Sequence, residues 1–446
     1  MFEYPTQRLH EIAAEALAAA RKLGATDAAV DVSESCGLSV NVRKGQVETI
    51  EQTRDKGLGV TVHIGQCRGN ASTSDFSSVA ISDAVSAAYQ IARHTAADDC
   101  AGLPDEDTIA REQRDLDLFH PWDISAEQAI DLACRTEAAA FATSPLIRNS
   151  EGASVGVSHG HFVTANSRGF AGGYPYSRHS IGCAPIAQRG SAMQRDDWYS
   201  ASAVPQCLAD PVKLGRYAAE RALSRLGARR LSTRKVPVLF EAPLACGLIG
   251  HFVQAASGGA LYRRTSFLLD CLGKDIFSSH IDIDEDPFIA AEMGSSPFDS
   301  EGVATRRRDV VSGGRLDGYF LSTYSARKLG MKTTGNAGGS HNLHLVSRLT
   351  RQLDDLPAML ERLGTGLFVT DLMGQGVNSV TGDYSRGASG FWVEKGKIRY
   401  PVEEITIAGN LRDMFRGIVA VGSDEIRRGT KRTGSILIDK MQVAGA

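Results

Sequence analysis

The feature that most restricts the fold of this chain is its glycine content. The sequence of 446 residues contains 46 glycines, and they interrupt short runs of alternating apolar and polar residues. Because glycine weakens helices and favours turns, this distribution predicts many strands joined by tight turns rather than a helical bundle. The length also exceeds one ordinary hydrophobic core, so about two domains are expected.

The first half of the chain combines helices with strands. Apolar spacing predicts helices over residues 6–23 and 77–94. The segment 28–64 between them has the alternation of four short strands. Helices do not separate every pair of strands, so the pattern predicts an antiparallel sheet with helices on one face, an α+β fold. The predicted turns within the segment are Cys36-Gly37, Lys44-Gly45 and Lys56-Gly57.

A domain boundary is expected within residues 227–235, a charged segment of small residues without apolar periodicity. We therefore predict an N-terminal mixed α/β layer domain over residues 1–228. The remainder, residues 229–446, is predicted to form a mostly β domain because it is richer still in strand patterns and turn pairs.

Composition excludes several classes of protein. The formal net charge of -3 gives no broad electrostatic reason for binding nucleic acid or an anionic membrane. None of the eight cysteines forms a CxxC pair, which argues against a zinc ribbon or a thioredoxin-type site. The N-terminus lacks the pattern of a signal peptide, and no run of about 18 apolar residues suggests a membrane span. A cytoplasmic location is therefore expected.

Residues 241–257 are predicted to form a helix that ends at Gly258-Gly259, and this helix carries the strongest chemical signal. Cys246, Gly247 and His251 stand in the frame of a metal-binding HExxxH motif. That motif supplies two histidine ligands to zinc and a glutamate that takes a proton from the bound water. Here cysteine replaces the first histidine and glycine replaces the glutamate, so the motif is degenerate.

Two interpretations in which these residues are chemically active remain open. Cys246 could serve as a thiol nucleophile beside His251, or the helix could hold a cryptic metal site. Residues five apart on an α-helix lie about 140° apart around its axis, which disfavours both. A second histidine pair, His341 and His344, lacks a carboxylate nearby in the sequence, so a structural role is favoured.

The glycine-rich segment 373–390 lacks the spacing of a phosphate-binding loop or of a GxSxG elbow. Its exposed backbone is better suited to pairing with an extended peptide by strand addition. The peptide-binding candidates in this segment are Gly382, Asp383, Tyr384 and Ser385.

Four long blocks of the sequence resemble the PmbA/TldE side of the TldD/PmbA family of bacterial metallopeptidases, and the resemblance extends over essentially the whole chain. The blocks are GHFVQAASGGALYRRTSFLLDCLGK from Gly250, SSPFDSEGVATRRRD from Ser295, YSARKLGMKTTGNAGGSHN from Tyr324, and MGQGVNSVTGDYSRGASGFWVEKGKIRYPVEEITIAGNLRDMF from Met373.

The resemblance implies a heterodimer with divided roles. The TldD-type subunit of this family carries HExxxH and a late cysteine as zinc ligands, whereas the PmbA-type subunit lacks the motif. The pair cleaves unfolded or extended peptides. In this chain Cys246 falls at the first histidine and Gly247 at the glutamate, while Gly250 and His251 match the end of the motif. Thr433 falls near the late cysteine.

The leading hypothesis is therefore a non-catalytic, metal-free subunit that binds peptide or unfolded protein beside a TldD-type partner, which would hold the zinc. A homodimer is possible where no such partner is present. One alternative is an independent peptidase that uses Cys246 or a cryptic metal site. The other is a non-proteolytic regulatory binding protein of the gyrase-modulator type.

Overall fold

The computed structural model describes residues 2–112 and 114–445, and the chain divides into two compact units. The first consists of Met1–Leu223, Phe288–Thr305 and Ser322–Gly338. The second consists of Ser224–Pro287, Arg306–Leu321 and Gly339–Ala446. Two short segments from the C-terminal half thus belong to the first unit, a feature that the predicted division at residues 228 and 229 does not contain.

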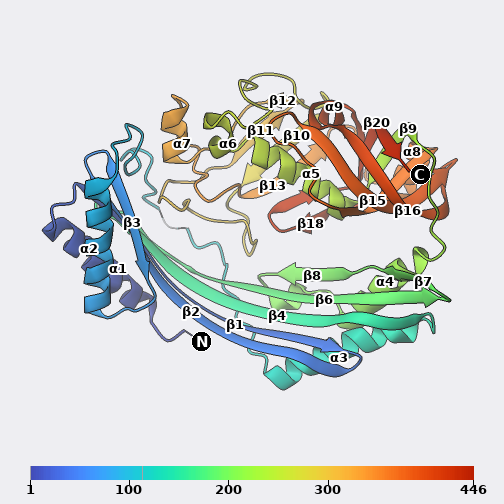
Figure 1. Ribbon diagram of the computed structural model, residues 1–446, viewed down its shortest axis with the longest axis horizontal. Helices are drawn as coiled ribbons and strands as arrows, with labels where there is room; N and C mark the ends of the chain where they lie inside the picture. The colour runs from blue at the N-terminus through green and yellow to red at the C-terminus, as the bar shows by residue number, and fades with distance from the viewer. Residues whose placement is uncertain (1, 113, 446) are drawn as a thin grey trace. The chain divides into compact units, whose positions relative to one another are not determined.

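The first unit is built on one eight-stranded sheet with the strand order β3-β2-β1-β4-β6-β7, in which β5 pairs with β4 and β8 with β6 (Figure 1). All of its pairings are antiparallel. The strands are β1 Asp27–Arg43, β2 Gln46–Ile64, β3 Cys67–Thr73, β4 Ile147–Asn166, β5 Ala171–Gly172, β6 Pro175–Arg189, β7 Ala192–Arg195 and β8 Trp198–Ser202.

The prediction of four short strands over residues 28–64 was wrong, because this segment forms two long ones. Only the turn at Lys44-Gly45 exists, where both residues have positive φ angles of 52° and 71°. At the expected turn at residue 37, the strand continues, and a side chain there would meet Val157 O at 3.0 Å. Glycine serves close strand packing at this position rather than a turn.

Helices cover one face of this sheet. The apolar face of α1 and α2 packs against residues such as Val30 and Val60 to form the main core of the first unit. A capping box formed by Ser125 and Gln128 begins α3. The helices of this unit are α1 Thr6–Lys22, α2 Ser78–His94, α3 Ala126–Thr143, the 3-10 helix η1 Pro205–Cys207, α4 Pro211–Ser224 and α7 Thr323–Lys328.

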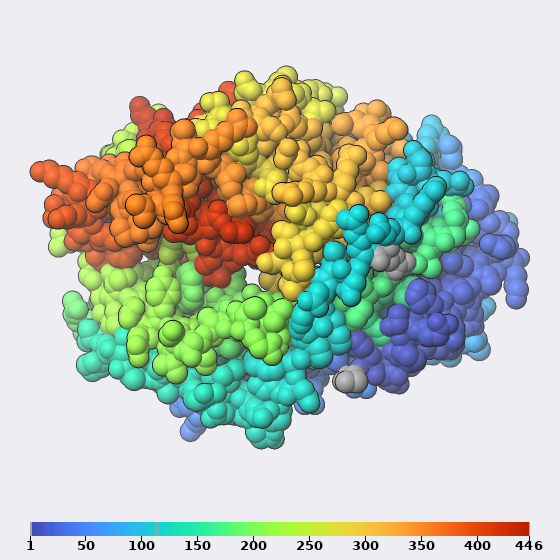
Figure 2. Space-filling view, turned by 180° about the vertical axis from the view of Figure 1, so that it is seen from behind, coloured from blue at the N-terminus to red at the C-terminus, as the bar shows by residue number. Residues whose placement is uncertain are grey.

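Residues 96–122 form an irregular segment on the surface, apart from position 113, which lies outside the described residues. Figure 2 shows this segment in cyan on the outside of the molecule. Its described residues form no helix.

The second unit contains two six-stranded sheets, β12-β11-β10-β13-β19-β18 and β16-β15-β14-β9-β20-β17. The predicted α+β class and the strand-rich character of the C-terminal half are confirmed. The strands are β9 Arg234–Phe240, β10 Ile281–Asp286, β11 Arg308–Ser312, β12 Arg315–Leu316, β13 Asn342–Ser347, β14 Gly366–Met373, β15 Asp383–Glu394, β16 Lys397–Asn410, β17 Ile418–Val421, β18 Ile426–Arg428, β19 Lys431–Thr433 and β20 Ile436–Ala444.

Helix α5 lies in the core of the second unit, where it packs against β18 and β19 of one sheet and β14 of the other. The helix ends at Ala255, two residues before the predicted end at residue 257. Gly258 does not serve as a helix stop but begins the short helix α6. The Ser257 hydroxyl accepts the N–H of Ala260 and caps this new helix. The helices of this unit are α5 Ala242–Ala255, α6 Gly258–Tyr262, α8 Leu356–Leu363 and α9 Leu411–Arg416.

In the part of the chain that the structure describes, no helix has both the length and the apolar character needed to cross a membrane.

Candidate functional site

Cys246 lies on the buried side of α5 and faces the β18–β19 hairpin. Its side chain is 4% exposed, and its sulfur lies 3.7 Å from Ile426 O and 3.6 Å from Lys431 O. Burial raises the pKa of the thiol to about 11, although the nearby backbone and cationic groups oppose the rise. A neutral thiol that donates to carbonyl oxygens is a poor nucleophile and a poor metal ligand.

The neighbouring motif positions on α5 carry no reactive group. Gly247 is exposed, and a methyl group placed on it would have no atom within 4 Å. Lys431 reaches along the helix, since a methyl group on Gly250 would lie 3.8 Å from Lys431 Cε. Burial lowers the pKa of Lys431, and its aliphatic stem lies beside Gly250.

Thr433 lies on β19 next to Cys246, which is separated from it by most of the second unit's sequence. Thr433 is completely buried, and its Oγ1 has no hydrogen-bond partner among the described residues. Its backbone is close enough to Cys246 to favour the thiolate slightly. The structure therefore brings the first and the last of the degenerate motif positions together.

His251 contacts a different element. Its ring packs edge-on against Tyr384 of β15, with 5.9 Å between the ring centroids and 78° between the ring planes. Burial, and to a smaller extent the charge of Arg386, lower the pKa of His251. Cys246 faces the β18–β19 hairpin, whereas His251 faces β15, so the five-residue spacing directs them to different strands.

These residues do not fit the catalytic zinc ion that the family resemblance implies for a TldD-type subunit. Such an ion needs about three donors around an open position, with a base beside its water. Here the thiol is protonated and bound to carbonyl oxygens, Gly247 has no side chain, and the position near the late ligand holds the hydroxyl of Thr433. The Lys431 side chain adds a cation where a metal would need donors.

The predicted peptide-binding residues lie where the loop after β14 enters β15. Gly382 has a φ of +85°, and Tyr384 is 1% exposed. Several backbone groups are already bonded: Ser385 N–H donates to Gly376 O at 2.7 Å, and Asp383 O accepts Asn378 N–H at 2.8 Å. β16 pairs with this stretch on its other side. Peptide binding here stays a prediction, and these particular backbone groups are not open for strand addition.

Tyr384 adds an unusual feature to this region. Its hydroxyl is buried and has no hydrogen-bond partner in the described part of the chain, while burial raises its pKa to about 12. Arg386 lies near enough to oppose that rise, but the two groups do not reach good hydrogen-bond geometry.

The two histidines at positions 341 and 344 have different surroundings. His344 lies on β13 and His341 directly precedes that strand, so the two do not share one face of a helix. His344 lies 2.9 Å from Glu425 and 3.8 Å from Asp284. The sequence around this pair supplies no carboxylate, but tertiary packing brings two to His344.

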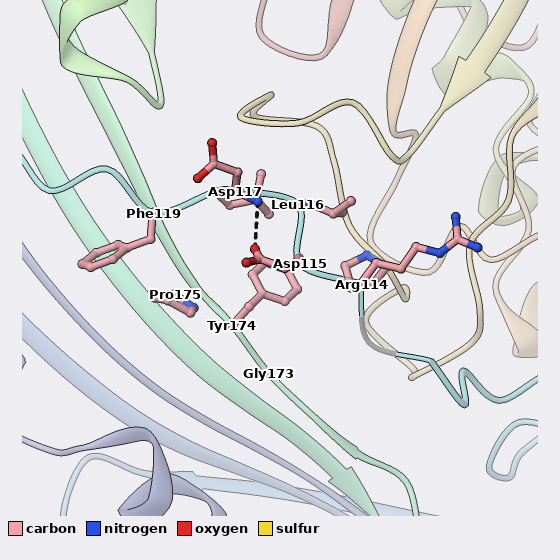
Figure 3. Close-up of a pocket in the computed structure, with 10 residues that line it drawn as sticks. Arg114, Asp115, Leu116, Asp117, Phe119, Gly173, Tyr174 and Pro175 are labelled. Carbon is pink, nitrogen blue, oxygen red and sulfur yellow. Dashed lines mark hydrogen bonds between the residues drawn. The ribbon is translucent and has the colours of Figure 1, made fainter.

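The first unit contains cavities that no sequence motif predicted. One cavity of about 390 Å³ lies between the segment 114–119 and the start of β6 (Figure 3). Asp115 Oδ1 accepts the backbone N–H of Asp117 at 2.9 Å, and Tyr174 and Pro175 form the opposite wall. A second cavity, of about 270 Å³, is lined by Asp31, His63 and Arg68.

Comparison with known proteins identifies the family. The chain matches three domains described as PmbA/TldA metallopeptidase: domain 1 over residues 28–92, the central domain over 119–226 and the C-terminal domain over 233–445. It is 47% identical to Metalloprotease PmbA of Escherichia coli O157:H7 over 438 residues, which cover 98% of this chain and 96% of that protein.

Solved structures agree with this assignment. A candidate modulator of DNA gyrase from Bacteroides thetaiotaomicron superposes with a TM-score of 0.91 at 26% identity, over 99% of this chain and 100% of the other. TldE from Thermococcus kodakarensis shares the fold, with a TM-score of 0.82 at 19% identity over 97% and 100% of the two chains. The chain therefore belongs to the TldD/PmbA family of metallopeptidases, as a PmbA-type member.

Proposed function

We propose that this chain is the non-catalytic, metal-free subunit of a cytoplasmic zinc peptidase whose active site belongs to a TldD-type partner. The observation that supports the proposal is the chemistry of the residues at the motif positions of α5. Its motif positions present a buried neutral thiol and an exposed glycine in place of a histidine ligand and a general base. Family membership supplies the expectation of a peptidase assembly.

The proposed role of α5 is structural. Its apolar residues pack against strands of both sheets of the second unit, and Phe252 contacts three other aromatic rings. Such a helix would keep the surrounding strands rigid beside a partner's active site. Extended peptide substrates would then be oriented by both subunits and hydrolysed only by the other one.

The test is to purify the chain alone and together with a TldD-type subunit. Each sample is analysed for zinc by mass spectrometry and for cleavage of a labelled unfolded protein. We expect zinc and hydrolysis only when the TldD-type subunit is present, and a stable complex on size-exclusion chromatography. Stoichiometric zinc together with hydrolysis by the lone chain would overturn the proposal.

The interpretation of Cys246 as a nucleophile is opposed by its raised pKa and by its carbonyl contacts. The nucleophile hypothesis predicts that Cys246→Ala abolishes the activity of the assembled pair. Under the proposed function the same substitution leaves that activity within about twofold of wild type.

A second candidate function is regulatory binding without proteolysis. The observation in its favour is the gyrase-modulator description of the Bacteroides structure, which covers nearly the whole of this chain. Immobilised chain that retains gyrase subunits, with no TldD-type protein present, would favour this candidate. Capture of a TldD-type subunit alone would count against it.

A further inference from the structure

A cavity in the first unit lies on the polar face of the main sheet. Its floor is made by side chains that the strand register places side by side. Asp31 of β1 stands opposite Thr164 of β4, and Ala29 stands opposite both Asn166 and Thr61. The alternate residues of these strands, including Val30 and Val60, point into the helix-covered core. The sheet therefore has one apolar face and one face equipped with polar groups.

The walls of this cavity are held in place by specific contacts. The loop 101–104 forms one wall, and Arg168 Nη1 donates to Pro104 O at 3.1 Å. Arg327 Nη2 donates to Leu103 O at 2.8 Å from another element of the same unit. Tyr324, on the rim, donates its hydroxyl to Asp98 Oδ2 at 2.7 Å. A cavity whose walls are tied down in this way loses little entropy when a ligand binds.

Acidic groups lie on one side of the cavity. Thr164 Oγ1 donates to Asp31 Oδ1 at 2.6 Å, which fixes the carboxylate in position. The Asp31 side chain is open to solvent, and yet desolvation by the surrounding protein raises its pKa. Glu301 lines the cavity as well, and its Oε2 accepts the backbone N–H of Thr323 at 2.8 Å.

A cationic group and a neutral imidazole occupy the neighbouring strands. Arg68 of β3 stands opposite His63 of β2, and its Nε donates to Asn70 at 3.1 Å. Within the described part of the chain, Arg68 takes part in no ion pair. His63 is 4% exposed, and its Nδ1 has no hydrogen-bond partner among the described residues. Burial, followed by the charge of Arg68, lowers the pKa of His63, so the ring is uncharged at neutral pH.

We propose that this cavity binds a small zwitterion, an amino acid or dipeptide, with its ammonium group at Asp31 and Glu301 and its carboxylate at Arg68. Neutral His63 and Asn166 supply the remaining hydrogen-bonding groups. The cavity volume of about 270 Å³ suits a ligand of this size, because drug-sized ligands occupy roughly 300–1,000 Å³.

Other ligand classes fit less well. The two carboxylates would repel a phosphate or another polyanion. A diamine would place one of its ammonium groups near Arg68, which takes part in no ion pair among the described residues. No group of three metal-binding side chains occurs among the described residues that could hold an ion here. The inference goes beyond the proposed function and does not depend on it, since the cavity shares no residue with α5.

The experiment is isothermal titration of the full-length chain with a panel of free amino acids and with alanyl-alanine. N-acetyl-alanyl-alanine and alanyl-alanine amide, which lack one terminal charge each, are the matched ligands. We expect at least one zwitterion to bind and both blocked forms to bind at least tenfold more weakly. Absence of binding by every zwitterion, equal binding of a blocked form, or preferential binding of putrescine or inorganic phosphate would overturn the proposal.

Variants locate the binding. Asp31→Asn and Arg68→Gln change exposed side chains, so both proteins are expected to fold, as circular dichroism would verify. Each should weaken binding of the zwitterion at least tenfold, and Asp31→Asn should also remove the penalty for N-acetylation. Asp83→Asn and Arg93→Gln on the exposed face of α2 are the matched controls. Equal weakening by the controls, or full binding by both cavity variants, would place the ligand elsewhere.

Discussion

Helix α5 in the second unit and the polar face of the main sheet in the first unit show opposite relations between sequence motif and chemistry. On α5 the spacing of a metallopeptidase motif persists, but its positions carry Cys246 with a raised pKa and Gly247 without a side chain. On the sheet no motif exists, yet strand pairing gathers Asp31, His63 and Arg68 around one cavity. The frame of a motif can therefore persist without its chemical groups, and strand pairing can gather charged and polar groups without any motif.

The physical reason lies in what each element needs in order to fold. The apolar face of α5 is required for packing whether or not the helix binds a metal, so its fold survives loss of the ligands. The polar face of the sheet is not needed for the core, which α1 and α2 form on the other side. Side chains on that face are therefore free to take up a binding role.

The largest expected effect tests whether α5 is structural. Phe252 is 0% exposed and packs edge-on against Phe277 at 5.4 Å. Phe252→Ala should lower the free energy of unfolding by about 3–5 kcal/mol, because a large cavity would remain. Urea denaturation measures this change, with the exposed Leu353→Ala as the control in the same unit. A loss under about 1 kcal/mol would mean that α5 is not a packing element.

The next effect separates a structural thiol from a reactive one. Because burial raises the pKa of Cys246 from 9.0 to about 11, its thiolate population falls by about 100-fold. Iodoacetamide at neutral pH should therefore alkylate Cys246 at least 100-fold more slowly than the exposed Cys207. Peptide mapping by mass spectrometry gives both rates in one sample. Preferential labelling of Cys246 would revive the nucleophile hypothesis.

The pH dependence of stability should have the same sign in both regions. Burial is the main cause that lowers the pKa of His63 and of His251 below 6.5. Each neutral histidine contributes its full share of the folding stability above the pKa of the unfolded state. This share declines as the pH falls from about 6.5 toward the lower pKa of the folded state, by about 1.4 kcal/mol per pKa unit. The difference in free energy of unfolding between wild type and His63→Gln, or between wild type and His251→Gln, should therefore shift in favour of the variant as the pH falls through this range.

Hydrogen exchange measured between pH 5 and 8 follows both units separately, and the exposed His94→Gln provides the control. A wild-type advantage that grows as the pH falls would contradict the prediction for that histidine.

The smallest effect compares two helical glycines. Gly247 on α5 has open space around it, so Gly247→Ala should stabilise the protein by about 0.5–1 kcal/mol. A methyl group on Gly215 of α4 would lie 2.0 Å from Thr136 O, so Gly215→Ala should destabilise it by about 1–3 kcal/mol. Thermal denaturation of the two variants measures both. Destabilisation by Gly247→Ala would indicate that this glycine has a packing role on α5.

Local signals in the sequence predicted many elements correctly. The helices at α1 and α2 were predicted from the spacing of their apolar residues. The hairpin turn at Lys44-Gly45 was also predicted, and both residues have positive φ angles. Each of these features depends on residues within a few positions of one another, which is why the sequence alone was enough.

Strand length was not predictable from the same signals. The segments around Gly37 and Gly57 were expected to turn, but β1 and β2 continue through both positions. A glycine is compatible with a turn and with an extended strand, and only pairing with a neighbouring strand decides between them. The assignment of Phe288–Thr305 and Ser322–Gly338 to the first unit is likewise set by contacts with residues far away in the sequence.

The sequence by itself determined the α+β class, the family and the departure of positions 246 and 247 from HExxxH, because these are properties of residue identity and local spacing. Tertiary structure alone decided that Cys246 meets the hairpin holding Thr433 while His251 meets Tyr384. It also decided that Asp31, His63 and Arg68 line one cavity. The reason is physical: burial, hydrogen bonding and charge depend on neighbours in space, and a sheet brings together residues that the chain separates.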